Sequence, residues 1–389
     1  MKMKQLSLYI HIPFCVRKCN YCDFLSAPAD ETTREVYMQA LLSEIEELKG
    51  SPVAERDVKT IFIGGGTPSL MTEAQTEKLL DKIKDVFLLT PDCEISIEVN
   101  PGTVTREKSE CYFKNGIHRI SIGLQSPDNA LLKTLGRIHT YEEFLKTYAY
   151  VRAAGIQNVN IDLMSALPGQ TAEQYCNGLK AVAELGAEHI SAYSLILEEG
   201  TPFFEKYNSA RDLMPDEEEE RDMYEKTGDI LKQYGYERYE ISNYAKKGYE
   251  CRHNTVYWRC EDYLGLGLGS ASLVDGVRFK NTCDLKEYMH AWKSGEGKSV
   301  QRREEEVLTE NARMEEFMFL GLRMMKGVSE ERFLAECGKS MQAVYGDRIK
   351  KLLGEKLVCY RDGDKNRRYL ALTPFGIDVS NYVFEQFLF

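Results

Sequence analysis

The stretch that decides the fold is Leu6 to Cys22, LSLYIHIPFCVRKCNYC, where a short apolar run ends at a proline and leads into three closely spaced cysteines. The alternating and β-branched residues from Leu6 to Ile12 predict a buried strand. Cys15, Cys19 and Cys22 then lie on a loop that leaves the carboxyl end of this strand. In parallel α/β proteins functional groups collect at that end, so the cysteines mark a predicted site.

The strand pattern recurs five more times in the first half of the chain. The runs are Val58 to Ile63, Ile95 to Val99, Arg119 to Leu124, Val159 to Met164 and Ile190 to Leu197. Stretches of helical period separate most of them, at Glu35 to Leu48, Glu73 to Val86, Tyr141 to Ala154 and Ala172 to Leu185. This alternation predicts a parallel α/β sheet, and periodicity alone leaves open whether the sheet closes partly into a barrel.

The second half of the chain changes in character. The acidic run from Asp216 predicts a helix that reaches about Tyr234, with Asp216 as its cap. From about residue 300 onward helices dominate. We expect helices over Glu310 to Met325, Ser329 to Cys337 and Met341 to Leu353, then a strand over Arg367 to Leu372 and a last helix over Phe375 to Phe387.

Composition and charge predict a soluble, cytoplasmic protein. The 389 residues are 43% hydrophobic and 29% charged, which suits a large core with a solvated surface. The net charge of −11 argues against binding to nucleic acid. Neither a signal peptide nor the roughly 18 apolar residues of a membrane span is found. Eleven cysteines in such a chain indicate reduced thiols rather than disulfides.

The cysteine triplet suits an iron–sulfur cluster. A cubane has four irons, so three cysteine ligands leave one iron open to another ligand. A structural zinc site would need a fourth ligand, and the local candidate is His11, which lies inside the predicted strand. The spacing of the triplet alone has modest specificity, so the neighbouring motifs must decide.

Residues at the ends of other predicted strands point to a bound small molecule. Gly64-Gly-Gly-Thr-Pro68, Glu98, Gln125 and Asp162 all lie there. Glycine lets a backbone approach a ligand closely, and carboxylates suit ribose hydroxyls or a sulfonium-bearing cation. Because the carboxyl ends of parallel strands face one crevice, these groups predict a shared ligand site beside the cysteines.

Together these motifs resemble the radical-SAM coproporphyrinogen dehydrogenase (HemN) family, and most closely its HemW-type heme chaperones. The resemblance is carried by Tyr9 to Cys15, Tyr21 to Phe24, Gly64 to Ser69, Glu98 to Pro101, Gly123 to Ser126, Leu135 to His139, Asn160 to Met164, Leu167 to Gly169 and Tyr263 to Gly267. It implies an α/β fold with a partial (β/α)6 radical-SAM barrel at 1–215. An α+β extension at 216–300 and a small winged-helix-like domain at 301–389 follow.

The resemblance implies a [4Fe–4S] cluster on Cys15, Cys19 and Cys22 that receives S-adenosylmethionine (SAM). The family's SAM contacts fall on Tyr9, Tyr21, Gly65, Gly66, Thr67, Glu98, Gln125, Arg137, Asp162, Ile196 and Ala271. Of these, Arg137 is suited to the methionine carboxylate, because a guanidinium binds carboxylates bidentately.

A second motif, Cys251-Arg-His-Asn-Thr-Val-Tyr-Trp258, resembles the heme-binding signature of the HemW group. His253 is the expected axial ligand of heme iron, and Cys251 is the alternative ligand. A lone histidine is also commonly a structural residue, and the sequence leaves this interpretation open.

Two functions from the same family compete. The first is a heme chaperone that delivers heme to an acceptor hemoprotein, and the second is an oxygen-independent coproporphyrinogen III oxidase that converts propionates to vinyl groups. By the family pattern, oxidases carry a further cysteine where this chain has Phe24, and a longer segment than the fourteen residues before Cys15. Both differences favour the chaperone over an active enzyme. A third hypothesis is an iron–sulfur protein that does not cleave SAM. The presence of Gly64 to Thr67 and of Glu98 argues against it.

The partners implied by the resemblance are heme, an acceptor hemoprotein and a one-electron reductant. Peripheral membrane contact through the acceptor and a cofactor-dependent homodimer are left open.

Overall fold

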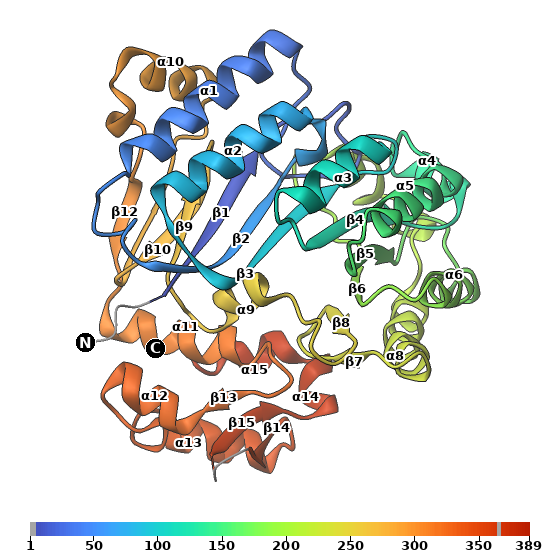
Figure 1. Cartoon of the computed structure of the whole chain (residues 1–389). Coiled ribbons are helices and arrows are strands. Elements are labelled where there is room, and N and C mark those ends of the chain that lie inside the picture. The colour runs from blue at the N-terminus through green and yellow to red at the C-terminus, as the bar shows by residue number, and fades with distance from the viewer. Residues whose placement is uncertain (1–4, 364–366) are drawn as a thin grey trace.

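One twelve-stranded sheet dominates the computed structural model, which describes residues 5–363 and 367–389 (Figure 1). Its centre is six parallel strands in chain order. They are β1 (Leu6–Ile12), β2 (Asp57–Gly65), β3 (Leu88–Val99), β4 (Arg119–Gln125), β5 (Asn158–Ser165) and β6 (His189–Ser194). The predicted parallel α/β sheet is confirmed.

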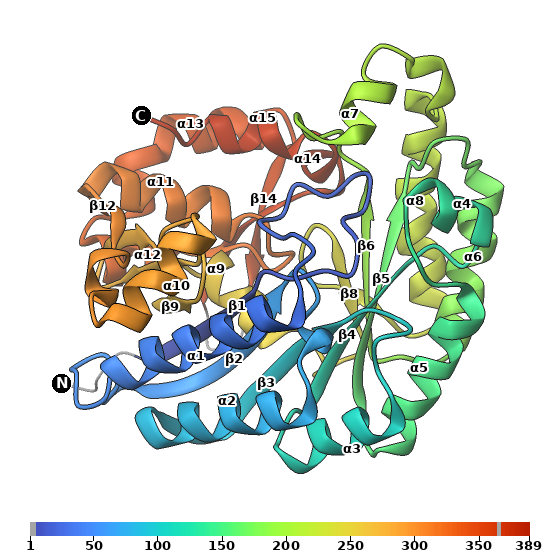
Figure 2. The ribbon, with the colours of Figure 1, turned by 90° about the horizontal axis from the view of Figure 1, so that it is seen from above.

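Helices cover the convex outer side of these strands, which curve as part of a barrel (Figure 2). The helices are α1 (Glu31–Glu47), α2 (Glu73–Val86), α3 (Arg106–Lys114), α4 (Asn129–Thr134), α5 (Tyr141–Ala153) and α6 (Ala172–Glu184). Side chains cap their starts, with full capping boxes at Thr72, Thr140 and Thr171. The strand order of the described residues ends at β12 and β7, so the barrel stays open.

Later strands extend both edges of this sheet. β9 (Tyr263–Leu266) pairs in parallel with β1, and three antiparallel strands follow it. They are β10 (Ala271–Val274), β11 (Val277–Lys280) and β12 (Arg303–Val307). At the other edge β8 (Asn243–Ala245) pairs with β6, and β7 (Glu237–Arg238) pairs with β8. Residues 216–300 thus continue the core sheet, and the division of the chain into three domains stays a prediction.

The helices between β6 and β12 are α7 (Pro202–Tyr207), α8 (Glu217–Gln233), α9 (Arg252–Trp258) and α10 (Leu285–Ser294). The predicted cap of α8 is confirmed, because the Asp216 carboxylate accepts a hydrogen bond from the Glu219 amide at 2.8 Å. Within the described residues, no helix combines the length and the apolar character that crossing a bilayer requires.

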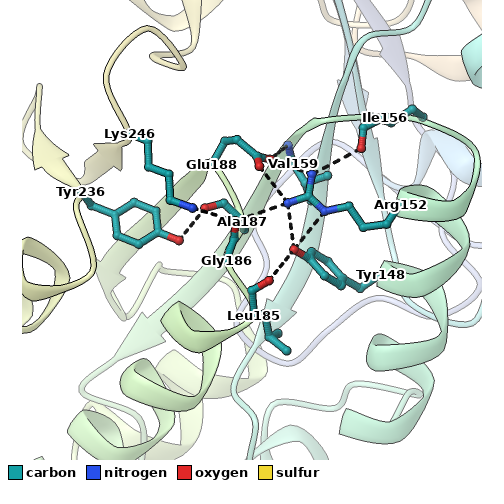
Figure 3. A network of polar contacts seen from close by, with 10 residues as sticks. All are labelled: Tyr148, Arg152, Ile156, Val159, Leu185, Gly186, Ala187, Glu188, Tyr236 and Lys246. Atoms are coloured by element: carbon teal, nitrogen blue, oxygen red, sulfur yellow. Dashed lines mark hydrogen bonds and ion pairs between the residues drawn. The ribbon is translucent and has the colours of Figure 1, made fainter.

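A network of polar contacts holds the turn between α6 and β6 (Figure 3). Arg152 on α5 pairs with Glu188 at 2.8 Å and donates to the Tyr148 hydroxyl at 2.9 Å. From the other side of the turn, Tyr236 and Lys246 donate to backbone carbonyls at 2.5 and 2.8 Å. The network therefore fastens the segment that carries β7 and β8 to the last parallel strand.

The C-terminal unit has its own hydrophobic core around a three-stranded sheet. Its elements are α11 (Glu310–Gly321), β13 (Val328–Ser329), α12 (Glu330–Cys337), α13 (Met341–Gly354), β14 (Val358–Asp362), β15 (Arg368–Leu372), α14 (Pro374–Asp378) and α15 (Ser380–Glu385). This arrangement matches the expected winged-helix-like unit. The prediction of a single last helix is wrong, because the backbone leaves helical geometry at Val379, with φ −116° and ψ 33°.

Candidate functional site

A cavity of about 470 Å³ opens at the carboxyl ends of the parallel strands. It brings together most of the residues that the sequence analysis selected. Those that line it are Cys15, Cys19, Tyr21, Cys22, Gly65, Gly66, Thr67, Glu98, Gln125, Arg137, Asp162 and Ile196. Tyr9 and Ala271 lie outside this lining: the Tyr9 hydroxyl hydrogen-bonds with His11 at 3.0 Å, and Ala271 is exposed on β10.

The loop after β1 presents the three cysteines half-buried at the cavity. Two side chains from loops elsewhere in the chain donate to their sulfurs, Thr67 shortly after β2 and Arg137 between α4 and α5. The Thr67 hydroxyl lies 3.5 Å from Cys15 Sγ, and Arg137 Nη1 lies 3.6 Å from Cys19 Sγ. Such donors stabilise the thiolate form, which is the form that ligates metal.

Asn100 joins these two donors and was not selected from the sequence. Its Nδ2 donates to Thr67 Oγ1 at 2.8 Å, and its Oδ1 accepts from Arg137 Nη2 at 2.6 Å. One amide therefore orients both side chains that contact the cysteines. Asn100 directly follows β3, in the motif from Glu98 to Pro101. Its position after a strand is the sequence feature that could have identified it as a site residue.

The described residues do not bring together the ligands of a mononuclear zinc site. Within residues 5–363 and 367–389, no three histidine, cysteine or acidic side chains converge on one point as a single ion requires. In a cubane each thiolate ligates a different iron, so the sulfurs need only surround the cluster. His11, the candidate fourth zinc ligand, uses Nδ1 with Tyr9 and Nε2 with the Leu25 carbonyl, at 3.0 and 2.9 Å.

The glycine run at the end of β2 is required by close contact with β1 and the cysteine loop. Gly65 has φ +117°, and a Cβ there would lie 2.7 Å from the His11 ring. A Cβ on Gly66 would lie 2.7 Å from the Phe14 carbonyl oxygen and 3.0 Å from Cys15 Sγ. The missing side chains thus face the protein itself, and their absence brings the backbone of β2 against the cysteine loop.

Glu98 and Asp162 give the cavity its acidic wall. Glu98 accepts a hydrogen bond from the Gly65 amide at 3.1 Å, and Asp162 accepts from Ser121 and Asn160 at 3.0 and 2.7 Å. Burial raises the pKa of both carboxyl groups, and with Asp162 nearby the pKa of Glu98 reaches about 7. A bound cation would restore the ionised form, which is what a sulfonium or ammonium group offers.

Gln125, the last residue of β4, has a strained backbone conformation and lines the cavity. Its φ is +71°, and the β4–β5 register shifts between Gly123 and Gln125. A bulge of this kind re-aims a side chain, and here the Gln125 amide accepts from the Tyr193 hydroxyl at 2.9 Å. Tyr193, a further lining residue that the sequence analysis did not select, fixes this orientation.

His253 lies inside α9 and is 1% exposed. Its Nδ1 hydrogen-bonds with the Thr60 hydroxyl at 2.8 Å, its Nε2 with the Tyr257 hydroxyl at 2.9 Å, and its ring stacks on Phe62. Burial lowers its pKa to about 3, so the ring is neutral. A neutral imidazole is the form that ligates metal, but Nε2 becomes available to iron only when Tyr257 moves.

Family models match two parts of the chain. The Radical SAM superfamily matches residues 9–182, and the HemN C-terminal domain matches residues 308–379. The curated protein "Heme chaperone HemW" of Lactococcus lactis is 37% identical over 388 residues, covering 100% of this chain and 98% of its own length. The HemW of Bacillus subtilis is 36% identical, covering 98% of this chain and 99% of its own length.

The chain belongs to the HemW family. The Escherichia coli HemW is 42% identical over 271 residues, covering 69% of this chain and 70% of that protein. Among solved structures, coproporphyrinogen III oxidase (HemN) from Escherichia coli, described as a radical SAM enzyme, has a TM-score of 0.81 at 22% identity. The match covers 100% of this chain and 91% of that one. This likeness confirms the expected fold, including its C-terminal unit.

Proposed function

We propose that this chain is a heme chaperone that binds a [4Fe–4S] cluster, SAM and heme, and delivers heme to an acceptor hemoprotein. The observation that carries the proposal is the match to HemW proteins over the full length of the chain, combined with a cavity that holds the cysteine triplet. The residues proposed to hold the cluster are Cys15, Cys19 and Cys22.

SAM is proposed to occupy the cavity beside the cluster. The carboxylates of Glu98 and Asp162 provide negative charge for its cationic groups, and Gln125 offers an amide to its polar atoms. Ile196, whose side chain is 69% exposed, supplies apolar surface at the rim. Tyr9 and Ala271, which lie outside the lining, stay predictions as SAM contacts. When bound, a reduced cluster of this type supplies the electron for SAM cleavage.

The oxidase is the second candidate, and the fold shared with HemN is what favours it. A fold does not establish a reaction, and the position where oxidases are expected to carry a cysteine is occupied here by Phe24, 62% exposed beside the cavity. Phe24 cannot ligate metal or transfer a proton. The chaperone is therefore the better account.

The proposed location and partners of the protein follow from this function. The chaperone would act in the cytoplasm, with a one-electron reductant for its cluster and a hemoprotein as acceptor. Peripheral contact with a membrane through that acceptor, and a homodimer that depends on the cofactors, belong to the same proposal.

One anaerobic experiment tests the function. Reconstituted wild type and His253→Ala are titrated with heme, and both are assayed for decarboxylation of coproporphyrinogen. We expect heme binding by wild type, a shifted or bleached Soret band for His253→Ala, and no decarboxylation. Retained cluster absorbance is the folding control for the variant. Steady decarboxylation by wild type would show that the protein is an oxidase. Identical heme spectra for wild type and His253→Ala would show that His253 is not a ligand of heme iron.

A further inference from the structure

A line of buried polar side chains leads from the acidic wall of the cavity deeper into the protein. Asp162 and Asn160 on β5 are two residues apart, so both face the same side of the sheet. His189 on β6 pairs with Asn160 in the sheet register and is 0% exposed, and Tyr239 directly follows β7. Of these four residues only Asp162 lines the cavity, so the other three act on a ligand there through their neighbours.

Each of the four side chains contacts the next at hydrogen-bond distance. Asn160 Nδ2 lies 2.7 Å from Asp162 Oδ1, and Asn160 Oδ1 lies 2.5 Å from His189 Nδ1. On the other side of the ring, His189 Nε2 lies 2.9 Å from the Tyr239 hydroxyl. That hydroxyl also accepts a hydrogen bond from the backbone amide of Cys251 at 3.3 Å. We call Asp162, Asn160, His189 and Tyr239 the hydrogen-bond series.

The Asn160 amide gives this series a direction. An ionised carboxylate only accepts hydrogen bonds, so the amide nitrogen of Asn160 must face Asp162 and its oxygen must face His189. Contacts with two serines agree with this orientation, because Asn160 Nδ2 also donates to Ser121 at 2.7 Å and its Oδ1 accepts from Ser191 at 3.1 Å. His189 must then carry a proton on Nδ1 in order to donate to the amide oxygen.

The His189 ring is neutral, which fixes the rest of the series. Burial, together with the positive charge of Arg119, holds the pKa of His189 well below its usual range. A neutral imidazole has one N–H, so a proton on Nδ1 leaves Nε2 as an acceptor for the Tyr239 hydroxyl. All the hydrogen bonds from the Cys251 amide onward therefore point toward Asp162. Bonds aligned in this way polarise one another and favour negative charge at the end that accepts.

Asp162 depends on this support because its surroundings disfavour its charge. Burial raises the pKa of its carboxyl group, and the carboxyl group of Glu98 faces it from β3. The hydroxyls of Tyr193 on β6 and Tyr21 on the cysteine loop also face it, and burial raises the pKa of both, so they stay un-ionised. Arg119 on β4 supplies positive charge that acts in the opposite direction.

We propose that His189 and Tyr239 are positioning residues of the SAM site, which fix the Asn160 amide so that Asp162 meets the ligand as an ionised acceptor. The inference rests on the proposed function, because the cationic groups and ribose hydroxyls of SAM are what Asp162 would bind. Neither positioning residue lines the cavity, so the effect of each on binding passes through the orientation and charge of Asp162. Such an effect varies with pH, whereas a role in folding alone does not.

Two substitutions interrupt the series. Tyr239→Phe removes the hydroxyl that donates to His189 and keeps the ring, and His189→Leu removes both ring nitrogens. Fewer donors directed toward Asp162 raise the pKa of its carboxyl group further, so its ionised form is lost at a higher pH. In anaerobic calorimetric titration at pH 6, SAM should bind about tenfold more weakly to His189→Leu than to wild type, and about threefold more weakly to Tyr239→Phe.

The same titrations at pH 8.5 should bring both variants to within about twofold of wild type, because Asp162 is then ionised in all three proteins. His189→Asn keeps an N–H where Nδ1 donates and should recover most of the affinity at pH 6. The matched control is Tyr236→Phe, in which the lost hydroxyl donates to the Ala187 carbonyl outside the series. It should lower the stability of the protein and leave its affinity for SAM at pH 6 unchanged.

A second measurement reads the proton position directly. In protein that carries isotope-labelled histidine, the NMR shifts of the ring nitrogens should show a neutral His189 with its proton on Nδ1. The signal is identified by its absence in His189→Leu. Cluster absorbance and urea unfolding report whether that variant is folded. Tyr239→Phe and the proton position test the proposal when it is not.

The outcomes separate this inference from the proposed function. Wild type that binds no SAM at any pH would overturn the proposed SAM site. Wild type that binds SAM, with both interrupting variants equal to it at pH 6, would overturn the positioning role and leave the function standing. An equal loss of affinity at pH 6 and 8.5 would show that His189 and Tyr239 have a structural role alone. A proton on Nε2 of His189 would contradict the direction of the series.

Discussion

The acidic wall formed by Glu98 and Asp162 predicts that the proposed binding of SAM depends on pH. Glu98 is held by the Gly65 amide and faces Asp162, and burial with this neighbouring charge raises its pKa to about 7. A carboxyl group with a raised pKa is protonated at a pH where an ordinary glutamate is ionised. Lowering the pH through 7 therefore removes negative charge from the site that we propose for SAM.

The magnitude follows from the ionised fraction. A carboxyl group of pKa 7 is about one-tenth ionised at pH 6 and about nine-tenths ionised at pH 8. When only the ionised form binds the cation, the apparent Kd varies inversely with this fraction. SAM should therefore bind about tenfold more weakly at pH 6 than at pH 8, a difference of about 1.4 kcal/mol.

Calorimetric titration of the reconstituted protein with SAM, performed anaerobically from pH 5.5 to 8.5, measures this dependence. The amino group of SAM also titrates, with an ordinary pKa of about 8, so the informative quantity is the difference in pH dependence between variants. Glu98→Gln should lose the part of the slope centred near pH 7. Asp162→Asn should move that midpoint to lower pH, because Asp162 raises the pKa of Glu98.

Equal pH profiles for wild type and Glu98→Gln between pH 6 and 8 would refute this reasoning. A midpoint that stays in place in Asp162→Asn would show that the two carboxylates do not interact as their placement indicates.

Three other predictions follow from local contacts. Replacing the three cluster cysteines by alanine should abolish the roughly four irons per chain of a reconstituted cubane, measured by iron and sulfide analysis. Gly66→Ala should lower cluster occupancy, because its Cβ would contact the Phe14 carbonyl and Cys15, whereas Gly354→Ala, with open space around it, should not. Tyr236→Phe removes a hydrogen bond to a buried carbonyl and should reduce the free energy of unfolding by about 1–3 kcal/mol in urea titration.

The parallel strands were predictable because each carries its own apolar pattern. β1 has the predicted bounds, whereas β3 begins at Leu88 rather than Ile95, since residues 88–93 are partly exposed and lack that pattern. α3 was missed because its nine residues, Arg106–Lys114, are largely polar. The strands β7 to β12 are two to five residues long, too short for a periodicity to appear, and their pairing with β1 and β6 is decided by tertiary contacts.

The site was predictable where its residues stand directly after strands. Glu98, Gln125 and Asp162 reach one cavity because parallel strands end at one edge. The role of Asn100 was not predictable, because it depends on Thr67 and Arg137 arriving from separate segments. The environment of His253 was likewise hidden, since its partner Thr60 lies on β2 and only the folded chain brings the two together.

The pairing of β1 with β9 means that the sheet around β1 cannot be completed until late in translation. Ser7 pairs with Tyr263 and Ile10 with Leu266, so the first strand has an open edge until the ribosome has passed Leu266. At about 5–20 residues per second this takes roughly 10 to 50 seconds. Throughout that time an unpaired edge stands directly before the cysteine loop, available to other nascent chains. Late arrival of β9 therefore leaves the edge of β1 open to pairing with other chains in the newborn protein, and this edge is closed in the finished protein.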